Sequence, residues 1–392
     1  MFSLTATLTL KPGRDSSIRR FHPWLFSGAI QKTEGNPADG DWVGVQSAQG
    51  EVLGYGHYQK NTITVRLLSF GALHPGQSVY AVKIEKAWRQ RLACGLLQEN
   101  NNAFRLVHGE GDGLPGLIID YYHGVAVVQA HSTGMDADRQ AIALALQETL
   151  GHHVHAVFYK NQPQGAIKST QTYLMGMSAV PHQIQEHGHL FWVDWEEGQK
   201  TGFFLDQREN RKRVAAYSQG RKVLNTFCYT GGFSVYALKA GADLVHSVDA
   251  SAKAIELTQR NIQLNAFDPT VHSCVAMDTF DYLKDKRHTY DLIILDPPAF
   301  AKHKDSKHQA MKGYQRLNAE AMKAIAPGGI LFTFSCSQVV DRQLFYDTIV
   351  SAAIQAGREI KVLEHLGQPA DHPVSIYHRE GEYLKGLVLY VA

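Results

Sequence analysis

Apolar and polar residues follow three different rhythms along the chain. In residues 1–72, short runs in which the two kinds alternate are separated by glycine and turn residues, as in Asp41-Trp-Val-Gly-Val. This alternation is typical of half-buried β-strands. In residues 73–189, apolar positions recur at helical spacing over 80–97 and again over 136–150, with strand-like runs between them. These patterns predict a small all-β domain followed by a small α+β domain.

From residue 190 to residue 392 the pattern changes to a regular alternation of strand and helix. The strands are continuous apolar runs, and each gap between them accommodates a helix; the runs are 222–227, 244–249, 271–278, 290–296, 329–335 and 383–391. Parallel strands that are covered by helices on both faces have this pattern. We therefore expect an α/β domain built on a doubly wound sheet of about seven strands.

Composition adds limits to this picture. The chain of 392 residues is 44% hydrophobic and 19% charged, which is ample apolar surface for folded domains. A net charge of +2 does not mark a nucleic-acid binder, so a phosphate-binding surface would need local clusters of cations. The first ten residues alternate like a strand instead of forming a signal peptide, and no apolar run approaches the ~20 residues of a membrane span. We expect a cytoplasmic protein with no membrane segment.

Cysteine and histidine usage gives no metal motif. The four cysteines, Cys94, Cys228, Cys274 and Cys336, form no CxxC pair, which argues against a zinc cage and against a secreted disulfide framework. There are 20 histidines, but no HExxH motif. The sequence therefore predicts no metal site and a reducing compartment.

The ends of the predicted parallel strands carry a candidate ligand site, because ligands of such sheets bind beyond the carboxyl ends of the strands. The first strand runs into Phe227-Cys-Tyr-Thr-Gly-Gly, where glycine lets the backbone approach a ligand at a helix N-terminus. The next two strands end in Asp249, which suits ribose hydroxyls, and in Asp278, which with Phe280 suits an adenine. A dinucleotide site would need GxGxxG in the first loop, so a nucleoside site fits better. The expected cofactor residues are Phe227, Tyr229, Thr230, Gly231, Asp249, Asp278, Phe280 and Asp296.

A polar segment precedes the first strand of this domain, with the sequence Lys200-Thr-Gly-Phe-Phe-Leu-Asp-Gln-Arg. It is either the start of a helix with a solvated face or a lid over the cofactor. As a lid, it would bring Phe204, Asp206, Gln207 and Arg208 to the ligand.

Two further strand ends carry reactive groups. Asp296-Pro-Pro-Ala-Phe ends the fourth strand and Ser335-Cys336-Ser337 ends the fifth. If the bound nucleoside donates a methyl group, this pair favours transfer to C5 of cytosine, because that carbon becomes nucleophilic only after a thiolate has added at C6. Cys336 is then the nucleophile, and Asp296 hydrogen-bonds N3 of the base. The C5 proton passes to Asp296 or to a water that it orients.

Contacts with a nucleic acid that carries this cytosine are expected at two places. Near the reactive groups they are Pro297, Pro298, Phe300 and Lys302. Near the start of the chain, cations lie beside aromatic residues in Lys11-Pro-Gly-Arg14 and Ile18-Arg19-Arg20-Phe-His-Pro-Trp24. A surface that holds phosphates and stacks a base needs such a combination. A solvated basic turn with Trp24 in the core explains this pattern near the start of the chain equally well, so both interpretations stand.

Several of these motifs together resemble the bacterial large-subunit ribosomal RNA methyltransferase I family. The resemblance rests on Lys200-Thr-Gly-Phe-Phe-Leu-Asp-Gln-Arg, Phe227-Cys-Tyr-Thr-Gly-Gly-Phe, Asp296-Pro-Pro and Ser335-Cys-Ser, and it extends from Leu10-Lys-Pro-Gly-Arg to Asp371-His-Pro-Val. It implies a PUA domain over 1–72, a central domain over 73–189 and a class I methyltransferase domain over 190–392. It also implies S-adenosylmethionine as cofactor and C5 of a cytosine in 23S rRNA as target.

The family is similar to this chain in its single catalytic cysteine. The wider group of RNA cytosine-C5 methyltransferases has a second cysteine where this chain has Pro298. Product release would then proceed without a second thiol. The substrate would be 23S rRNA or a large-subunit assembly intermediate, and the chain would act alone or as a homodimer.

Three other functions compete with this one. Asp296-Pro297-Pro298 beside Phe300 would also suit an RNA methyltransferase that acts on an exocyclic amine and needs no thiol. An RNA-binding ribosome assembly factor could keep an inert methyltransferase fold, although the set of Gly231, Asp249, Asp278 and Asp296 argues against it. A nicotinamide oxidoreductase is disfavoured by the missing glycine pattern.

Overall fold

The computed structural model describes residues 4–71, 78–161, 169–284, 286–300 and 307–392. The chain forms two compact units. The first contains Met1–His182, Val193–Phe203 and Ala370–Gly381, and the second contains Gln183–Trp192, Phe204–Pro369 and Glu382–Ala392. The boundaries expected at residues 72 and 189 remain predictions.

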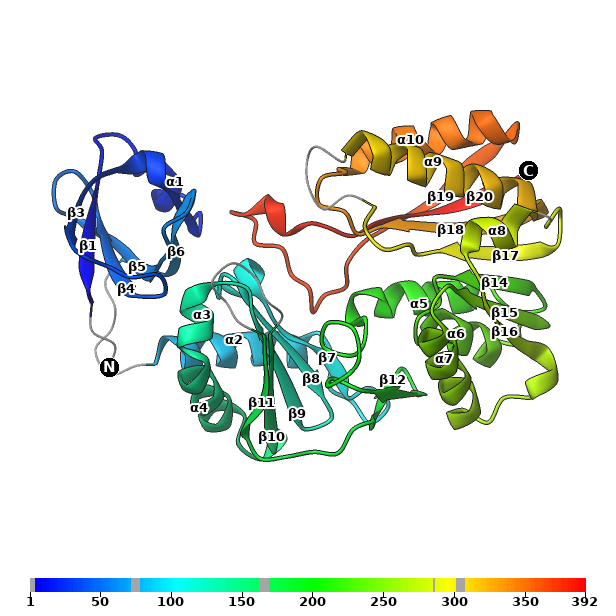
Figure 1. The fold of residues 1–392 in the computed structure, drawn as a ribbon, viewed down its shortest axis with the longest axis horizontal. Helices are drawn as coiled ribbons and strands as arrows, with labels where there is room; N and C mark the ends of the chain where they lie inside the picture. Colours follow the sequence, from blue (N-terminus) through cyan, green and yellow to red (C-terminus); the bar gives the residue numbers. More distant parts are fainter. Residues whose placement is uncertain (1–3, 72–77, 162–168, 285, 301–306) are drawn as a thin grey trace. The chain divides into compact units, whose positions relative to one another are not determined.

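The first unit begins with the six-stranded sheet that the alternating pattern predicts (Figure 1). Its strands lie in the order β2-β6-β5-β4-β1-β3, and leucine and valine side chains such as Leu8, Val43 and Val65 are fully buried in its core. One short helix, α1, precedes β2. The elements are β1 Ala6–Leu10, α1 Ser16–Arg19, β2 Trp24–Phe26, η1 Ser27–Ala29, β3 Ile30–Gly35, β4 Trp42–Gln46, β5 Val52–Tyr58 and β6 Ile63–Phe70.

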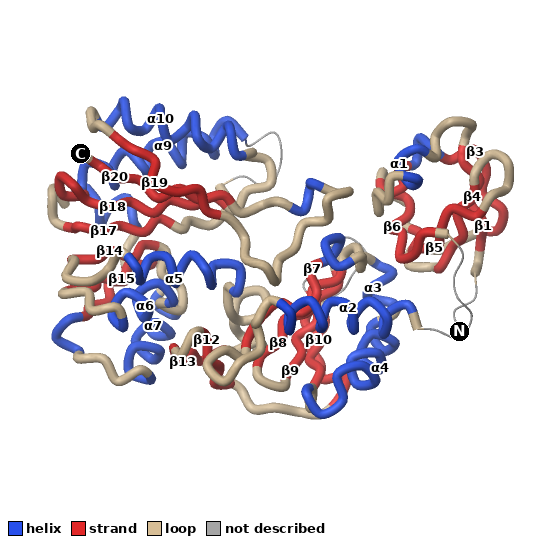
Figure 2. The backbone as a smooth tube through the Cα atoms, turned by 180° about the vertical axis from the view of Figure 1, so that it is seen from behind, coloured by secondary structure: helices blue, strands red, loops and turns tan. Residues whose placement is uncertain are grey.

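A five-stranded sheet in the order β11-β10-β9-β8-β7 forms the rest of this unit, with α2 and α4 packed against it (Figure 2). The helix expected over 80–97 ends earlier, because Gly95 adopts φ +68° directly after the C-cap Cys94. The elements are α2 Val79–Ala93, β7 Ala103–His108, η2 Gly109–Asp112, β8 Leu117–Tyr122, β9 Val125–Ala130, α3 Thr133–Ala137, α4 Arg139–Leu150, η3 Gly151–His153, β10 Ala156–Asn161 and β11 Thr170–Met175.

A segment from near the end of the sequence, Ala370–Gly381, also belongs to the first unit. Asp371 holds it there, since its carboxylate accepts a hydrogen bond from the backbone N–H of Arg105 at 2.9 Å and its carbonyl accepts one from Arg91 at 2.9 Å. Arg91 is fully buried and also forms a bidentate pair with Asp112. The C-terminal region therefore contributes to both units.

The second unit is the α/β domain that the sequence predicts. Its seven strands lie in the order β16-β15-β14-β17-β18-β20-β19, in which the first five are parallel and β20 runs antiparallel to both neighbours. The strands are β14 Lys222–Thr226, β15 Leu244–Asp249, β16 His272–Ala276, β17 Tyr290–Leu295, β18 Ile325–Ser335, β19 Ile360–Leu366 and β20 Lys385–Val391. The fold class is thus confirmed. The chain order reverses between β14 and β17, which is where such sheets bind ligands.

Helices cover both faces of this sheet (Figure 1). One face carries α5, α6 and α7, and the other carries α8, α9 and α10. The remaining elements of the second unit and its flanks are β12 His182–Glu186, β13 His189–Val193, η4 Leu205–Gln207, α5 Arg208–Ala216, α6 Gly232–Lys239, α7 Ala252–Leu264, η5 Pro269–Val271, α8 Thr279–Lys284, α9 Lys307–Ala324 and α10 Arg342–Ala356. The short helix η7 Arg379–Gly381 belongs to the first unit.

Two strands differ from the expectation. The fifth parallel strand starts at Ile325 instead of Gly329, because Ile325 already pairs with Tyr290 of β17; the extra residues of β18 before Ile330, which pairs with Leu292, form a bulge at the Pro-Gly-Gly sequence. The run expected over 271–278 forms the shorter strand β16, which lies at the edge of the sheet and leaves Cys274 half-buried.

Candidate active site

The loop after β14 has a backbone conformation with positive φ angles, which few residues other than glycine adopt. Phe227 and Tyr229 adopt φ +54° and +48°, and Gly231 adopts φ +74°. Side chains of α7 hold this shape from behind: Thr258 donates to the carbonyl of Tyr229 at 3.0 Å, and Asn261 donates to the carbonyl of Thr230 at 2.8 Å. The loop therefore presents a fixed backbone surface at the start of α6.

Gly231 packs so closely against α7 that no side chain would fit at its position. A Cβ atom built on it would lie 2.6 Å from Cγ2 of the fully buried Thr258. Phe204 closes one side of the same loop, with its ring edge-on to that of Tyr229 at 5.1 Å between centroids. Half-buried aromatic rings and a tight glycine backbone together form a cradle that fits the flat and polar parts of a nucleoside.

Asp249, at the end of β15, faces this loop. Its Oδ2 accepts from the backbone N–H of Tyr229 at 3.1 Å and its Oδ1 accepts from that of Ser251 at 2.9 Å. A carboxylate offers about four acceptor positions, so this one is held in place and keeps the capacity to bind two hydroxyls. This acceptor suits the hydroxyls of a ribose.

Asp278 and Phe280 follow β16. Asp278 is exposed, and its Oδ1 accepts from the backbone N–H of Phe280 at 2.8 Å, as a helix cap does. The guanidinium of Arg316 lies over the ring of Phe280, 4.9 Å from its centroid. The capping role is thus present, and it is compatible with the expected contact to an adenine.

The four expected lid residues differ in what they contact. Arg208 is fully buried, and Gln207 is nearly so and accepts from Asn210 at 2.6 Å. Asp206 accepts from the hydroxyl of Tyr383 at 2.7 Å. These contacts anchor the segment inside the second unit, and the half-buried ring of Phe204 is the one that packs on the Gly231 loop.

Sequence reasoning missed the ion pair that holds this segment. Arg211 forms a bidentate pair with Glu186, with both distances 2.7 Å, and it also donates to the carbonyl of Phe204 at 2.9 Å. Both partners are buried, and the Glu186 carboxylate raises the pKa of Arg211 despite the opposing effect of its burial. The two residues lie 25 positions apart with no motif between them, so no local signal marks them.

The reactive groups lie at the carboxyl ends of neighbouring strands. Leu295 of β17 pairs with Thr333 of β18, and Asp296 and Cys336 follow shortly after that pair. Strands advance about 3.3 Å per residue and lie about 4.8 Å apart, so the two α-carbons are roughly 8 Å apart if both strand directions continue. Both side chains are half-buried.

Two residues beside Cys336 were not predicted. The hydroxyl of Tyr314 accepts from Ser335 at 3.0 Å, and burial raises the pKa of Tyr314 to about 12, with Cys336 and Asp296 adding to the shift. Lys385 donates to the carbonyl of Ser337 at 2.6 Å. Burial lowers the pKa of Lys385 to about 8, and the thiol of Cys336 opposes that shift.

The residues near Asp296 that are expected to contact the base differ in their exposure. Pro297 is buried, Pro298 is exposed, and the ring of Phe300 packs on that of Tyr314 at 4.7 Å between centroids. Lys302 lies outside the described residues.

The expected RNA surface near the start of the chain is partly occupied by protein contacts. Arg14 and Arg20 are exposed, whereas Arg19 pairs with Asp15 at 2.6 Å and with Glu51. Trp24 is half-buried, and its indole N–H donates to Glu110 at 3.0 Å. Trp24 is therefore not in the core of the β-sheet, and its role in RNA binding stays a prediction.

No helix among the described residues is long and apolar enough to cross a membrane.

Comparisons with known proteins agree with these features. Residues 104–380 match the family model of S-adenosylmethionine-dependent methyltransferases, and residues 8–70 match that of PUA-like domains. Ribosomal RNA large subunit methyltransferase I from Aeromonas hydrophila is 37% identical over 98% of this chain and 99% of its own length, and that from Pseudoalteromonas atlantica is 39% identical with the same coverage.

Two solved structures share the fold over the whole length of both chains. One is an S-adenosylmethionine-dependent methyltransferase from Streptococcus mutans, with a TM-score of 0.83 and 23% identity. The other is a methyltransferase solved in complex with SAH, with a TM-score of 0.84 and 24% identity. With both the methyltransferase model and full-length relatives matched, the chain belongs to the ribosomal RNA large subunit methyltransferase I family of S-adenosylmethionine-dependent enzymes.

Proposed function

We propose that this chain transfers a methyl group from S-adenosylmethionine to C5 of a cytosine in large-subunit ribosomal RNA, with Cys336 as the nucleophile. The observation that carries the proposal is a half-buried thiol at the carboxyl end of β18, next to the strand that ends in Asp296 and beside the buried cation of Lys385. Thiol nucleophiles are activated in surroundings of this kind.

The cofactor residues fit S-adenosylmethionine, which supplies an electrophilic methyl group when bound. Asp249 would bind the ribose hydroxyls, since its carboxylate is fixed by two backbone N–H groups. The Gly231 loop would lie against the amino-acid part, and Asp278 with Phe280 would hold the adenine. Phe204, Asp206, Gln207 and Arg208 would close the site from the side.

The chain's own groups account for each change at the base. The thiolate of Cys336 forms a bond to C6, and the electron pair displaced from the C5–C6 bond makes C5 nucleophilic. Asp296, protonated at the start, would pass its proton to N3 as the C6–S bond forms, which stabilises the charge that this addition moves into the ring. After methyl transfer, the resulting carboxylate, or a water that it orients, takes the C5 proton; the C6–S bond breaks to return the thiolate, and the N3 proton leaves to solvent.

Lys385 is a positioning residue in this scheme. Its ammonium is held by the carbonyl of Ser337, one residue beyond Cys336. A positive charge at that place favours the thiolate over the thiol. The pairing of Ser335 with Lys385 across β18 and β20 fixes this neighbourhood through the sheet itself.

The partner follows from the names of the relatives, which act on ribosomal RNA of the large subunit. We infer that this chain acts on 23S rRNA, free or in an assembly intermediate, in the cytoplasm. Arg14 and Arg20 are the exposed cations that would contact phosphates.

Cys336→Ala tests the mechanism, with Cys274→Ala as the control, because Cys274 is a half-buried thiol in β16 and does not follow a strand end. We expect Cys336→Ala to lose methyl transfer to 23S rRNA and still bind S-adenosylmethionine in a calorimeter, while Cys274→Ala keeps both. RNA containing 5-fluorocytidine should trap a covalent complex with the wild type and with Cys274→Ala, and not with Cys336→Ala.

Full methyl transfer by Cys336→Ala would refute the cytosine-C5 mechanism and favour an exocyclic amine as the target. If the wild type failed to bind the cofactor at all, an inert assembly factor would be the better description. Mapping 5-methylcytosine in the rRNA of a strain that lacks this protein identifies the nucleotide.

A further inference from the structure

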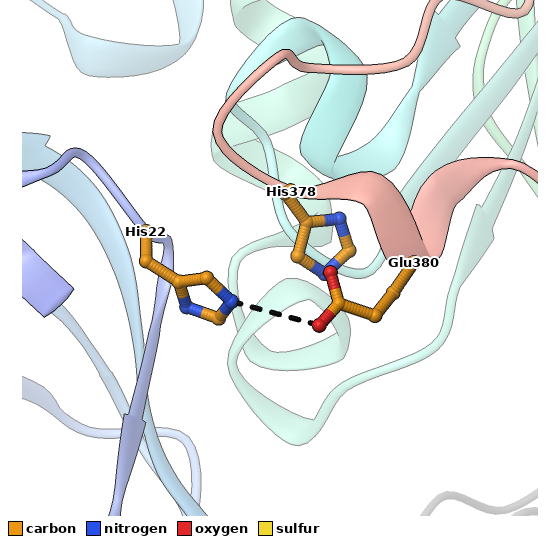
Figure 3. A group of neighbouring side chains, drawn as sticks. All are labelled: His22, His378 and Glu380. Carbon is orange, nitrogen blue, oxygen red and sulfur yellow. Dashed lines mark ion pairs between the residues drawn. The ribbon is translucent and has the colours of Figure 1, made fainter.

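Three side chains from opposite ends of the sequence meet in the first unit (Figure 3). His22 precedes β2, whereas His378 and Glu380 lie in the segment Ala370–Gly381. Nε2 of His22 lies 3.9 Å from one carboxylate oxygen of Glu380, and Nε2 of His378 lies 3.7 Å from the other. One ligand atom from each of the three falls within 4.8 Å of those of the other two. We propose that His22, His378 and Glu380 bind a divalent transition metal, with Zn²⁺ the best match.

His378 gives an independent indication that something binds here. Its side chain is 2% exposed, and neither ring nitrogen has a hydrogen-bond partner among the residues that the structure describes. Buried polar atoms nearly always have a partner. In Figure 3 the rings of His22 and His378 both point toward the carboxylate of Glu380. A cation between them would satisfy His378.

The surroundings of His378 hold its ring in place. The ring of Trp24 packs against it edge-on, 4.4 Å away between centroids, and restrains its orientation. The carboxylate of Glu380 supplies negative charge to offset that of the cation.

His22 can present Nε2 after a change of tautomer. Its Nδ1 accepts from the backbone N–H of Trp24 at 3.2 Å and also lies 3.3 Å from the carbonyl oxygen of that residue. Zinc binding selects the tautomer in which Nδ1 donates to that carbonyl and the lone pair lies on Nε2, directed at the cluster. Metal-binding histidines usually make such a contact with the second nitrogen.

Two imidazoles and one carboxylate form a ligand set that zinc accepts, with water in the fourth position, whereas calcium and magnesium prefer oxygen ligands. At zinc–ligand distances of about 2.0–2.1 Å, tetrahedral ligand atoms lie about 3.3 Å apart. The separations of 3.7 and 3.9 Å, which run to different carboxylate oxygens of Glu380, are close to this value, and all three ligand atoms lie within 4.8 Å of one another. Binding one ion therefore needs a rotation of Glu380, whose side chain is 57% exposed, and a small approach of the two imidazoles.

Such an ion would tie the late segment to the N-terminal sheet. The same two parts already touch through Phe21 and Tyr377, whose ring centroids lie 5.3 Å apart. The metal would add a bonded link beside this aromatic contact, so its role is structural. It does not depend on the proposed methyl transfer.

The test uses the full chain, stripped with a chelator and titrated with ZnCl2 in a calorimeter. We expect one zinc per chain and a thermal midpoint that rises with zinc. Glu380→Gln and His22→Gln change side chains that are not fully buried, so the fold should survive, and each should weaken zinc binding by about 10- to 100-fold. Cobalt(II) should give the visible bands of a four-coordinate site in the wild type and lose them in both variants.

His152→Gln is the matched control, because His152 is an exposed histidine in the same unit that stacks on a second histidine and lies outside the cluster. It should bind zinc like the wild type. The proposal is overturned if the wild type binds no zinc at micromolar concentrations. It is equally overturned if both cluster variants bind as the wild type does, or if binding is lost in the His152 variant.

Discussion

Replacing Gly231 by alanine tests how the cofactor loop is built. Two costs should add. An L-residue at the φ of +74° costs about 1–2 kcal/mol in the left-handed region. The new Cβ would also lie 2.6 Å from Cγ2 of Thr258, and overpacking at a buried site costs about 1–3 kcal/mol. We expect Gly231→Ala to lower the free energy of unfolding by about 2–5 kcal/mol.

The clash should also reach the cofactor. Thr258 is fully buried and cannot turn away, and its hydroxyl holds the carbonyl of Tyr229 at 3.0 Å. The backbone N–H of Tyr229 in turn holds Asp249 at 3.1 Å. Moving Thr258 therefore displaces the carboxylate proposed to bind the ribose. We expect the affinity for S-adenosylmethionine to fall by about tenfold or more, equal to about 1.4 kcal/mol.

Gly220→Ala separates the two costs, because Gly220 has φ +67° and no atom within 4 Å of a built Cβ. It should lose only the conformational part, about 1–2 kcal/mol, and keep its cofactor affinity. Thr258→Ser in the Gly231→Ala background removes the clashing methyl group and retains the hydroxyl. Although that change alone costs about 1 kcal/mol, it should recover part of the stability and of the binding.

Urea denaturation of the wild type, Gly231→Ala, Thr258→Ser and the double variant gives the coupling free energy between positions 231 and 258. Calorimetry gives the cofactor affinity. A coupling of about 1–3 kcal/mol in the stabilising direction is expected. The reasoning is refuted if Gly231→Ala and Gly220→Ala are equally stable and bind the cofactor equally well, because the steric contact would then have no effect.

Three further predictions follow from other contacts. Burial lowers the pKa of Lys385 from 10.5 to about 8, so the unfolded chain keeps this proton to higher pH than the folded chain. The free energy of unfolding of the wild type should therefore rise relative to that of Lys385→Met between about pH 8 and pH 10.5. A difference that stays constant with pH in urea denaturation would contradict this. Arg211→Met leaves the carboxylate of Glu186 buried without its partner and should cost about 3–5 kcal/mol. Arg213→Met, at a partly exposed pair with Glu364, should cost less than about 1 kcal/mol in the same assay, and similar losses would argue against the buried pair. Arg14→Ala and Arg20→Ala should each reduce the slope of log RNA affinity against log salt concentration by about one. Arg19→Ala should change that slope less, because Asp15 and Glu51 already neutralise Arg19. Filter binding at several salt concentrations measures the three slopes, and equal slopes would contradict the prediction.

The sequence by itself determined the class of fold and the places where chemistry can occur. Continuous apolar runs at regular intervals predict a parallel sheet because strands buried on both faces need them. In such a sheet the carboxyl ends meet at one edge, so Asp249, Asp296 and Cys336 could be assigned to one site without coordinates. The motifs that resemble the family are local, and a local pattern is readable from one sequence.

The tertiary structure decided which distant residues support those groups. Three of these supports are contacts between separate elements, and no periodicity or spacing encodes them: Arg211 with Glu186, Lys385 with Cys336, and Thr258 with Gly231. The return of Ala370–Gly381 to the first unit is of the same kind, and it alone brings His378 to His22. The physical reason is that a side chain's partner is set by how the elements pack, whereas its own secondary structure is set largely by its neighbours in sequence.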